Sequence, residues 1–283
     1  MRRTCLGLLL LLLPLPLLAQ NLSHVKVEML TEQTSVQSGG SVTLGFHFRM
    51  QKGWHLYWQN PGDSGQAPSI IWTLPDGFTA GDILWPAPQR LTLPNLADYG
   101  YTNEVVLMVP IQSPPKLKSG RFVRFSAKVR WLVCNEICIP GDMNFNARLV
   151  VKNHRPKVSG RHEYYFQMAR RALPKPLPEG WNASAFLGKK DFFINVSPAG
   201  SLSKTATAAF MPLNPNQIEN AATPAFRWTG SSFQIKLKRS DQMTQVPGTL
   251  DGVLVVKDKK NTKSYQLSMP LQGNGTSEAE HDP

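Results

Sequence analysis

Two segments in which apolar and polar residues alternate constrain the fold of this chain more than any other feature. Apolar side chains recur at every second position in residues 125–133 and again in residues 143–151. Successive side chains of a β-strand point to opposite faces, so a period of two predicts a strand with one buried face. The connection between the two segments carries Cys134 and Cys138. We therefore expect an antiparallel hairpin with both cysteines at its tip.

The rest of the chain also favours β structure. The sequence has 21 Gly and 23 Pro among 283 residues, and they separate short runs rich in Val, Ile, Phe, Trp and Thr. This punctuation is typical of β-sandwiches and barrels. We predict an all-β protein made of two small β-sandwich domains, at residues 20–155 and 181–272.

Residues 156–180 are expected to join the two domains. Residues 161–172 are the best helix candidate after the N-terminal region, and the proline-rich residues 174–180 end that helix and form a stiff linker. Residues 273–283 are polar, so they are expected to form a disordered tail.

Residues 1–19 have the pattern of a secretory signal peptide. Arg2 and Arg3 precede a leucine-rich stretch, and Ala19 closes an acceptable cleavage site. The apolar stretch is short and broken by proline, so membrane insertion is not expected. Cys5 would leave with the signal, which makes Cys134 and Cys138 the only cysteines of an exported protein.

The formal charge of +12 does not indicate nucleic acid as a partner. Lys and Arg are scattered along strand-like segments without a run of five, and no nucleic-acid-binding motif accompanies them. A solvated basic surface explains this pattern. No phosphate-binding loop, catalytic triad or paired carboxylates stand out, and no cofactor is expected.

The cysteine pair admits three interpretations. A disulfide between Cys134 and Cys138 closes a ring of five residues, for which loop entropy gives only about 2 kcal/mol of stabilisation. The small stabilisation favours thiol–disulfide exchange with a partner over a purely structural staple. The third interpretation is copper(I) binding by two thiolates, to which Met108 and Met143 would add thioethers if they were not packed in the core.

Charged neighbours of the pair act in opposite directions. Glu136 lies inside the ring and would oppose a thiolate, whereas Lys128 and Arg130 would favour one. The sequence leaves the balance open.

Trp54, His55, Tyr57 and Trp58 form the densest aromatic cluster. In a strand these side chains would divide between the two faces, so we expect half of them in the core and half on the surface. The functional alternative is a wall around the cysteine tip, with His55 as a base or a metal ligand.

Residues 131–141, Trp-Leu-Val-Cys-Asn-Glu-Ile-Cys-Ile-Pro-Gly, resemble the redox hairpin of the periplasmic N-terminal region of DsbD-family disulfide reductases. The resemblance is closest to the ScsB-like branch, which is linked to copper tolerance. It extends over most of the chain after the signal, through residues 53–65, 85–90, 99–104, 212–222 and 252–256.

The resemblance implies immunoglobulin-like sandwiches and a cysteine pair that shuttles electrons in the periplasm. The donor would be a thioredoxin-like domain fed by a DsbD-type membrane domain, and the acceptors would be periplasmic proteins that carry disulfides. Cys138 would be the sulfur attacked by partners, and Cys134 would resolve the mixed disulfide. The chain would then be the disulfide-reductase component of a larger system, since it contains neither the membrane domain nor the thioredoxin-like domain.

The resemblance also implies a loop with an aromatic cap over the pair. The matching residues are 96–101, with Asp98 at the position where the aromatic residue is expected. Tyr99 or Tyr101 would then replace the cap. Tyr57 and Trp58 would complete the wall around the sulfurs.

Overall fold

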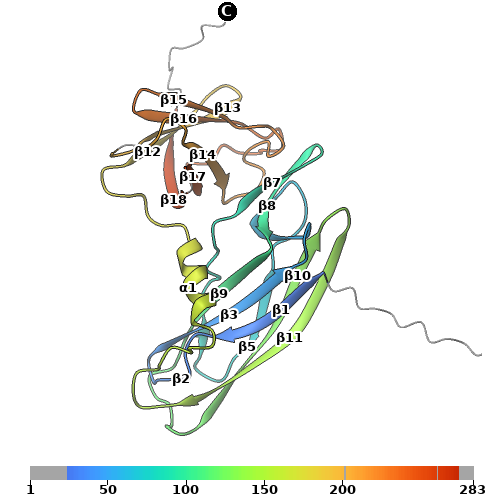
Figure 1. Cartoon of the computed structure of the whole chain (residues 1–283), viewed down its shortest axis with the longest axis vertical. Coiled ribbons are helices and arrows are strands. Elements are labelled where there is room, and N and C mark those ends of the chain that lie inside the picture. The colour runs from blue at the N-terminus through green and yellow to red at the C-terminus, as the bar shows by residue number, and fades with distance from the viewer. Residues whose placement is uncertain (1–23, 201, 260, 274–283) are drawn as a thin grey trace, which may run out of the picture.

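The computed structural model describes residues 24–200, 202–259 and 261–273 (Figure 1). The expected signal peptide lies outside the described residues, as does the expected tail except for Gly273. The described residues form two β domains and one short helix, α1 (Glu163–Ala172), which confirms the predicted all-β class. No helix in these ranges is long and apolar enough to cross a bilayer.

The first domain consists of two sheets that face each other. One sheet has the strand order β1-β3-β9-β6, with β1 at Val25–Thr31, β3 at Ser41–Met50, β9 at Glu104–Gln112 and β6 at Thr79–Ala80. The other has the order β2-β11-β10-β4-β8-β7, and β5 also pairs with β10. Its strands are β2 (Ser35–Val36), β11 (Cys138–Val151), β10 (Phe122–Cys134), β4 (His55–Gly62), β8 (Leu96–Thr102), β7 (Gln89–Leu93) and β5 (Ser69–Thr73).

Strands β10 and β11 form the predicted hairpin. Their antiparallel register runs from Phe122 opposite Val150 to Cys134 opposite Cys138. Phe125 and Val129 are fully buried, as the alternation predicts, because the inner face of the hairpin packs against the other sheet. Met143 is an exception to the predicted pattern, since 47% of it is exposed although the alternation places it on the inner face.

Helix α1 packs on the outer face of the first sheet. Phe166 and Ala169 are buried against Leu30, Val106 and Met108, which come from β1 and β9. The helix begins two residues later than expected and ends where predicted.

A partly buried ion pair ties the helix to the sheet. Arg170 donates hydrogen bonds to the two carboxylate oxygens of Glu32, at 3.1 and 2.6 Å. Burial alone would raise the pKa of Glu32, but the hydrogen bonds from Arg170 and Thr43 outweigh it and hold this pKa below its ordinary value.

The second domain is also sandwich-like. Seven strands follow the order β14-β17-β18-β12-β13-β16-β15, and β12 pairs with β18 at only two positions. The two groups of strands on either side of this short junction enclose one apolar cluster that contains Phe192, Phe233 and Leu254. The strands are β12 (Asn182–Leu187), β13 (Asp191–Ser197), β14 (Thr207–Pro212), β15 (Ala225–Thr229), β16 (Ser232–Lys238), β17 (Thr249–Asp258) and β18 (Asn261–Gln272).

The two domains contact each other directly. Met211, Val253 and Val255 of the second domain belong to the same apolar cluster as Trp58 and Tyr99 of the first. In Figure 1 the second domain sits above β7 and β8, which form one end of the first domain. The contact therefore lies on the sheet that also carries the cysteine hairpin.

Candidate functional site

The two cysteines are joined by a disulfide at the tip of the β10–β11 hairpin. Cys134 is the last residue of β10, Cys138 is the first of β11, and their sulfurs are 2.01 Å apart. A tight turn closes the hairpin, in which the Asn135 N–H donates to the Ile137 carbonyl at 3.0 Å. The register places the two cysteines directly opposite each other, with their Cα atoms 4.1 Å apart.

The two sulfurs have different surroundings. Cys134 is 2% exposed and pairs with His55 on the neighbouring strand β4. Cys138 is exposed, together with the turn residues Glu136 and Ile137. A partner that approaches the tip therefore meets Cys138 first.

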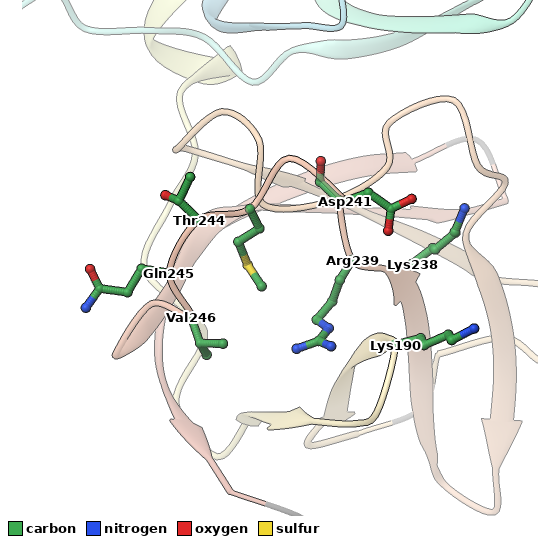
Figure 2. Close-up of a pocket in the computed structure, with 9 residues that line it drawn as sticks. Lys190, Lys238, Arg239, Asp241, Thr244, Gln245 and Val246 are labelled. Atoms are coloured by element: carbon green, nitrogen blue, oxygen red, sulfur yellow. The ribbon is translucent and has the colours of Figure 1, made fainter.

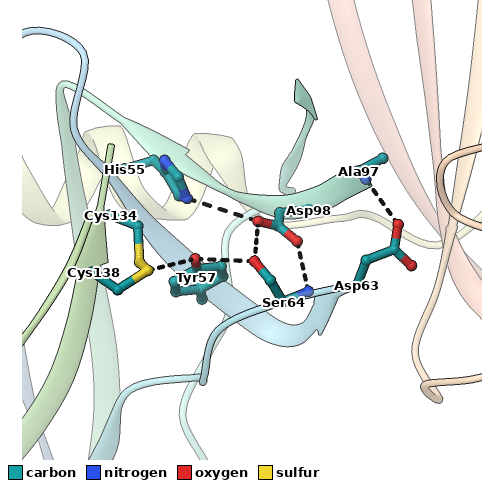
Figure 3. Close-up of polar contacts among 8 residues, drawn as sticks. All are labelled: His55, Tyr57, Asp63, Ser64, Ala97, Asp98, Cys134 and Cys138. Carbon is teal, nitrogen blue, oxygen red and sulfur yellow. Dashed lines mark hydrogen bonds and ion pairs between the residues drawn. A yellow bond between two sulfur atoms is a disulfide. The ribbon is translucent and has the colours of Figure 1, made fainter. Parts of the chain in front are cut away.

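A chain of polar contacts connects Cys138 to a buried carboxylate (Figure 3). The Tyr57 hydroxyl lies 3.8 Å from the Cys138 sulfur and 3.4 Å from the Ser64 hydroxyl. Ser64 donates its hydroxyl proton to Asp98 at 2.7 Å and its backbone N–H to the other carboxylate oxygen at 2.9 Å. The sulfur of a disulfide has no proton and Ser64 donates its own to Asp98, so the single Tyr57 proton is shared between the Cys138 sulfur and the Ser64 oxygen.

Two glycines allow the segment of residues 62–65 to fold over Tyr57. Gly62 and Gly65 have φ values of +94° and +75°, in the region that favours glycine. A Cβ at Gly65 would lie 2.0 Å from the Tyr57 ring, and one at Gly62 would lie 2.5 Å from the Ala97 carbonyl oxygen. Any other residue at Gly65 would push Tyr57 or the segment away.

Burial controls the protonation of the neighbouring ring groups. Desolvation lowers the pKa of His55, and the Asp98 carboxylate 4.0 Å away opposes this effect only in part. Desolvation also raises the pKa of Tyr57; the Ser64 hydrogen bond counteracts it and the charge of Asp98 adds to it. At neutral pH Tyr57 therefore keeps its proton and remains a hydrogen-bond donor toward Cys138.

The other predicted aromatic residues lie farther from the sulfurs. Trp58 is in the core, edge-to-face with Tyr99. The Tyr99 hydroxyl donates to the Asn220 side chain at 2.8 Å, and the Tyr101 hydroxyl donates to the Pro86 carbonyl at 2.8 Å.

The aromatic cluster divides between the two faces of the strand as expected, but the prediction that half of it lies on the surface was wrong. Trp54, His55, Tyr57 and Trp58 are all buried, with exposures between 1% and 8%. Trp54 and Trp58 pack in the core between the sheets. Tyr57 lies on the opposite face of the strand, where the segment of residues 62–65 covers it. Alternation of apolar and polar residues does not predict such a covering segment.

The expected covering loop at residues 96–101 was also misplaced. These residues belong to β8, which pairs with β4 and β7. Asp98 is fully buried beneath the site, and the residue that lies over the Tyr57 ring is Gly65, with Ser64 at the hydroxyl end. The turn-forming sequence Gly62-Asp63-Ser64-Gly65 was the available signal for this cover.

The described residues contain no group of three or more His, Cys, Asp or Glu side chains that could hold a metal ion. The two methionines considered as thioether ligands lie elsewhere. Met108 is buried against α1, and Met143 is opposite Val129 in the hairpin. The methionines therefore lie away from the tip, whereas His55, the other candidate ligand, is opposite Cys134 on β4.

Two cavities of appreciable size lie away from the cysteines. One, of about 440 Å³, is on the second domain and is lined by residues that include Lys190, Arg239 and Asp241 (Figure 2). The other, of about 1130 Å³, lies between the domains, where Arg90, Met211 and Tyr265 contribute to its walls. No cysteine lines either of these two cavities.

Comparisons with known proteins agree with this geometry. Residues 25–149 match the family model described as "Thiol:disulfide interchange protein DsbD, N-terminal". Residues 25–149 form a DsbD-family N-terminal domain. The match and the disulfide identify this part of the chain as a thiol–disulfide exchange domain.

One solved structure supports the fold over most of the chain. The N-terminal periplasmic domain of ScsB from Proteus mirabilis aligns with a TM-score of 0.66 and 18% identity, over 91% of this chain and 96% of that one. A protein of unknown function from Porphyromonas gingivalis W83 aligns with a TM-score of 0.28 and 11% identity, over 88% and 100% of the two chains, and carries no argument. No curated protein sequence matches the chain.

Proposed function

We propose that this protein is a periplasmic thiol–disulfide exchange protein that passes electrons through the Cys134–Cys138 pair. The donor is a thioredoxin-like protein, itself fed from the membrane, and the acceptors are disulfide-bearing proteins of the cell envelope. The observation that carries the proposal is the difference between the sulfurs: Cys138 is exposed at the tip and Cys134 is buried behind it.

The exchange follows from this arrangement. A donor thiolate attacks the Cys138 sulfur, a mixed disulfide forms, and Cys134 leaves as a thiolate. The second thiol of the donor then attacks the donor sulfur that is bonded to Cys138 and releases Cys138 as a thiolate. The donor ends as a disulfide, and the Cys134–Cys138 pair has gained two electrons. In the next half-reaction Cys138 attacks an acceptor disulfide, and Cys134 displaces the acceptor while the hairpin disulfide forms again.

Tyr57 assists the exposed sulfur. Its hydroxyl, 3.8 Å from the Cys138 sulfur, supplies a hydrogen bond to the thiolate that forms on reduction. A hydrogen bond to the charged form lowers a thiol pKa and increases the thiolate fraction at neutral pH. Burial keeps Tyr57 protonated for this purpose.

The test uses matched cysteine variants and reduced thioredoxin as the donor. The single-cysteine variants are mixed with oxidised thioredoxin instead: Cys138 of Cys134→Ser should attack the thioredoxin disulfide and give a mixed disulfide, visible on a non-reducing gel, whereas Cys138→Ser should give none. The wild-type pair should become reduced, as measured by alkylation and gel shift. A pair that stays oxidised in excess reduced thioredoxin, or a mixed disulfide trapped on Cys134 instead, contradicts the proposal.

Copper(I) binding by the same sulfurs is the alternative that these variants also address. Titration of the reduced protein against a copper(I) chelator should show tight one-to-one binding that either substitution abolishes, if copper is the ligand. Such binding without any exchange with thioredoxin would favour a copper-tolerance function.

A further inference from the structure

We propose that the second domain holds the redox site in its working geometry, with Asn220 as the positioning residue. The inference rests on the proposed function, and it assigns a role to a domain whose sequence contains no cysteine. Asn220 lies between β14 and β15 and is 6% exposed.

The Asn220 side chain bonds to the first domain through both of its polar atoms. Its amide nitrogen donates to one carboxylate oxygen of Asp63 at 2.9 Å. Its amide oxygen accepts from the Tyr99 hydroxyl at 2.8 Å. A buried side chain that satisfies both groups across a domain boundary is fixed in place by both domains.

First-domain side chains also clamp the backbone of the same segment. Arg90 donates to the Asn220 carbonyl at 2.6 Å, and to the next two carbonyls at 3.3 Å. At the other end, the Asn60 amide donates to the Pro212 carbonyl at 2.8 Å. Residues 212–222 are therefore held at both ends against strands β4 and β7, which belong to the sheet that carries the cysteine hairpin.

From Asp63 the contacts continue to the exposed sulfur. The second carboxylate oxygen of Asp63 accepts from the Ala97 N–H at 2.8 Å, next to Asp98 in β8. Asp63 also directly precedes Ser64, which bonds to Asp98 and contacts Tyr57. Asn220 thus anchors the segment of residues 62–65 that covers Tyr57.

The position of Tyr57 matters because hydrogen bonds weaken steeply as distance and angle depart from the optimum. A looser cover would let the Tyr57 hydroxyl leave the Cys138 sulfur or let water take its place. The thiolate would then lose a stabilising donor, and the pKa of the Cys138 thiol would rise. Asn220 accordingly acts on the sulfur only through Asp63, Ser64 and Tyr57.

A charge swap tests this chain of contacts. Asn220→Asp places two carboxylates face to face, because both Asp63 and the new side chain only accept hydrogen bonds. Adding Asp63→Asn to Asn220→Asp restores every bond. The amide now at position 63 donates to the carboxylate at position 220 and still accepts from the Ala97 N–H, and the carboxylate at position 220 accepts from the Tyr99 hydroxyl. Asn214→Asp is the matched control, since it adds the same charge to an exposed side chain of the same segment.

The readout is the pH profile of iodoacetamide alkylation at Cys138, in a Cys5→Ser, Cys134→Ser background that leaves one thiol. Asn220→Asp should move the midpoint upward and slow alkylation at pH 7 by roughly five- to tenfold, close to one pKa unit. The swap should return the wild-type profile, and Asn214→Asp should not change it. Tyr99→Phe, which removes one bond to Asn220, should produce a smaller shift in the same direction.

The inference is overturned if Asn220→Asp leaves the midpoint of the alkylation profile unchanged or moves it downward. It is also overturned if the Asp63→Asn, Asn220→Asp double variant shows the same upward shift as Asn220→Asp alone. If Asn220→Asp does not fold by circular dichroism, the swap must still match wild type and Tyr99→Phe must still shift; failure of either overturns it. Wild-type protein that does not exchange with thioredoxin while the profiles shift as expected overturns the proposed function and leaves the positioning role of Asn220 in place.

Discussion

Breaking the disulfide should leave the fold of the first domain intact. The bond closes a ring of only five residues, from Cys134 to Cys138, at the end of a hairpin whose first strand is 13 residues long. The loop-entropy relation gives about 2 kcal/mol for such a ring. The rest of the hairpin is held by its ladder and by buried residues such as Phe125 and Val129, which do not depend on the bond.

The assay is urea denaturation followed by tryptophan fluorescence. The oxidised protein, the protein reduced with dithiothreitol and the Cys134→Ala, Cys138→Ala variant are compared under the same conditions. The reduced protein should lose about 2 kcal/mol of unfolding free energy, or about 4–8 °C in Tm for a chain of this size. The double variant should lose about 2–3 kcal/mol, because a small cavity at the buried Cys134 adds to the lost bond, and reductant should not change its curve.

A loss above about 5 kcal/mol, or unfolding on reduction without denaturant, would refute this reasoning. The pair would then be a structural staple, because a protein that unfolds when reduced cannot cycle between the two states. A loss near the predicted value is what repeated opening and closing in use requires.

Three further changes test separate parts of the structure. Tyr57→Phe removes the hydroxyl beside Cys138, so the alkylation midpoint of this thiol in the reduced protein should rise; an unchanged midpoint contradicts the role of that contact. Gly65→Ala should cost about 2–3 kcal/mol in urea unfolding, because the positive φ and the Tyr57 ring both oppose a Cβ, and a neutral effect would mean that the cover is loose. Glu32→Gln should cost about 1 kcal/mol at pH 7, since the half-exposed Arg170 loses a charged partner. The pKa of Glu32 is lowered on folding, so this difference is fully present above the ordinary Glu value of about 4.3 and should disappear as pH falls through the lower folded value; a difference independent of pH would argue against the ion pair.

The sequence predicted the features that follow from local periodicity. The hairpin strands, the position of both cysteines at its tip and the helix that ends at Ala172 all depend on spacing within a single segment. Short strands such as β15 were not predicted, because its alternation of apolar and polar residues extends over only five positions, which is a weak signal.

The groups around the sulfur were harder to predict, because they come together only through tertiary contacts. Tyr57 and Cys138 are 81 residues apart, and Asp63 and Asn220 are 157 apart. A buried carboxylate such as Asp98 has the sequence context of a surface residue, and its burial is explained by the two hydrogen bonds from Ser64 and by His55 4.0 Å away. Met143 was assigned to the core because the alternation continues toward the tip, where the hairpin extends past the apolar interior.

The unequal exposure of the two sulfurs also bears on oxidative damage. Peroxide that reaches the reduced protein is expected to oxidise Cys138 to a sulfenic acid, while Cys134 is sheltered inside the sheet. The sheltered thiol can then condense with the sulfenic acid, expelling water and restoring the hairpin disulfide before irreversible sulfinic acid accumulates. Burial of one partner therefore provides the vulnerable sulfur with a built-in means of repair.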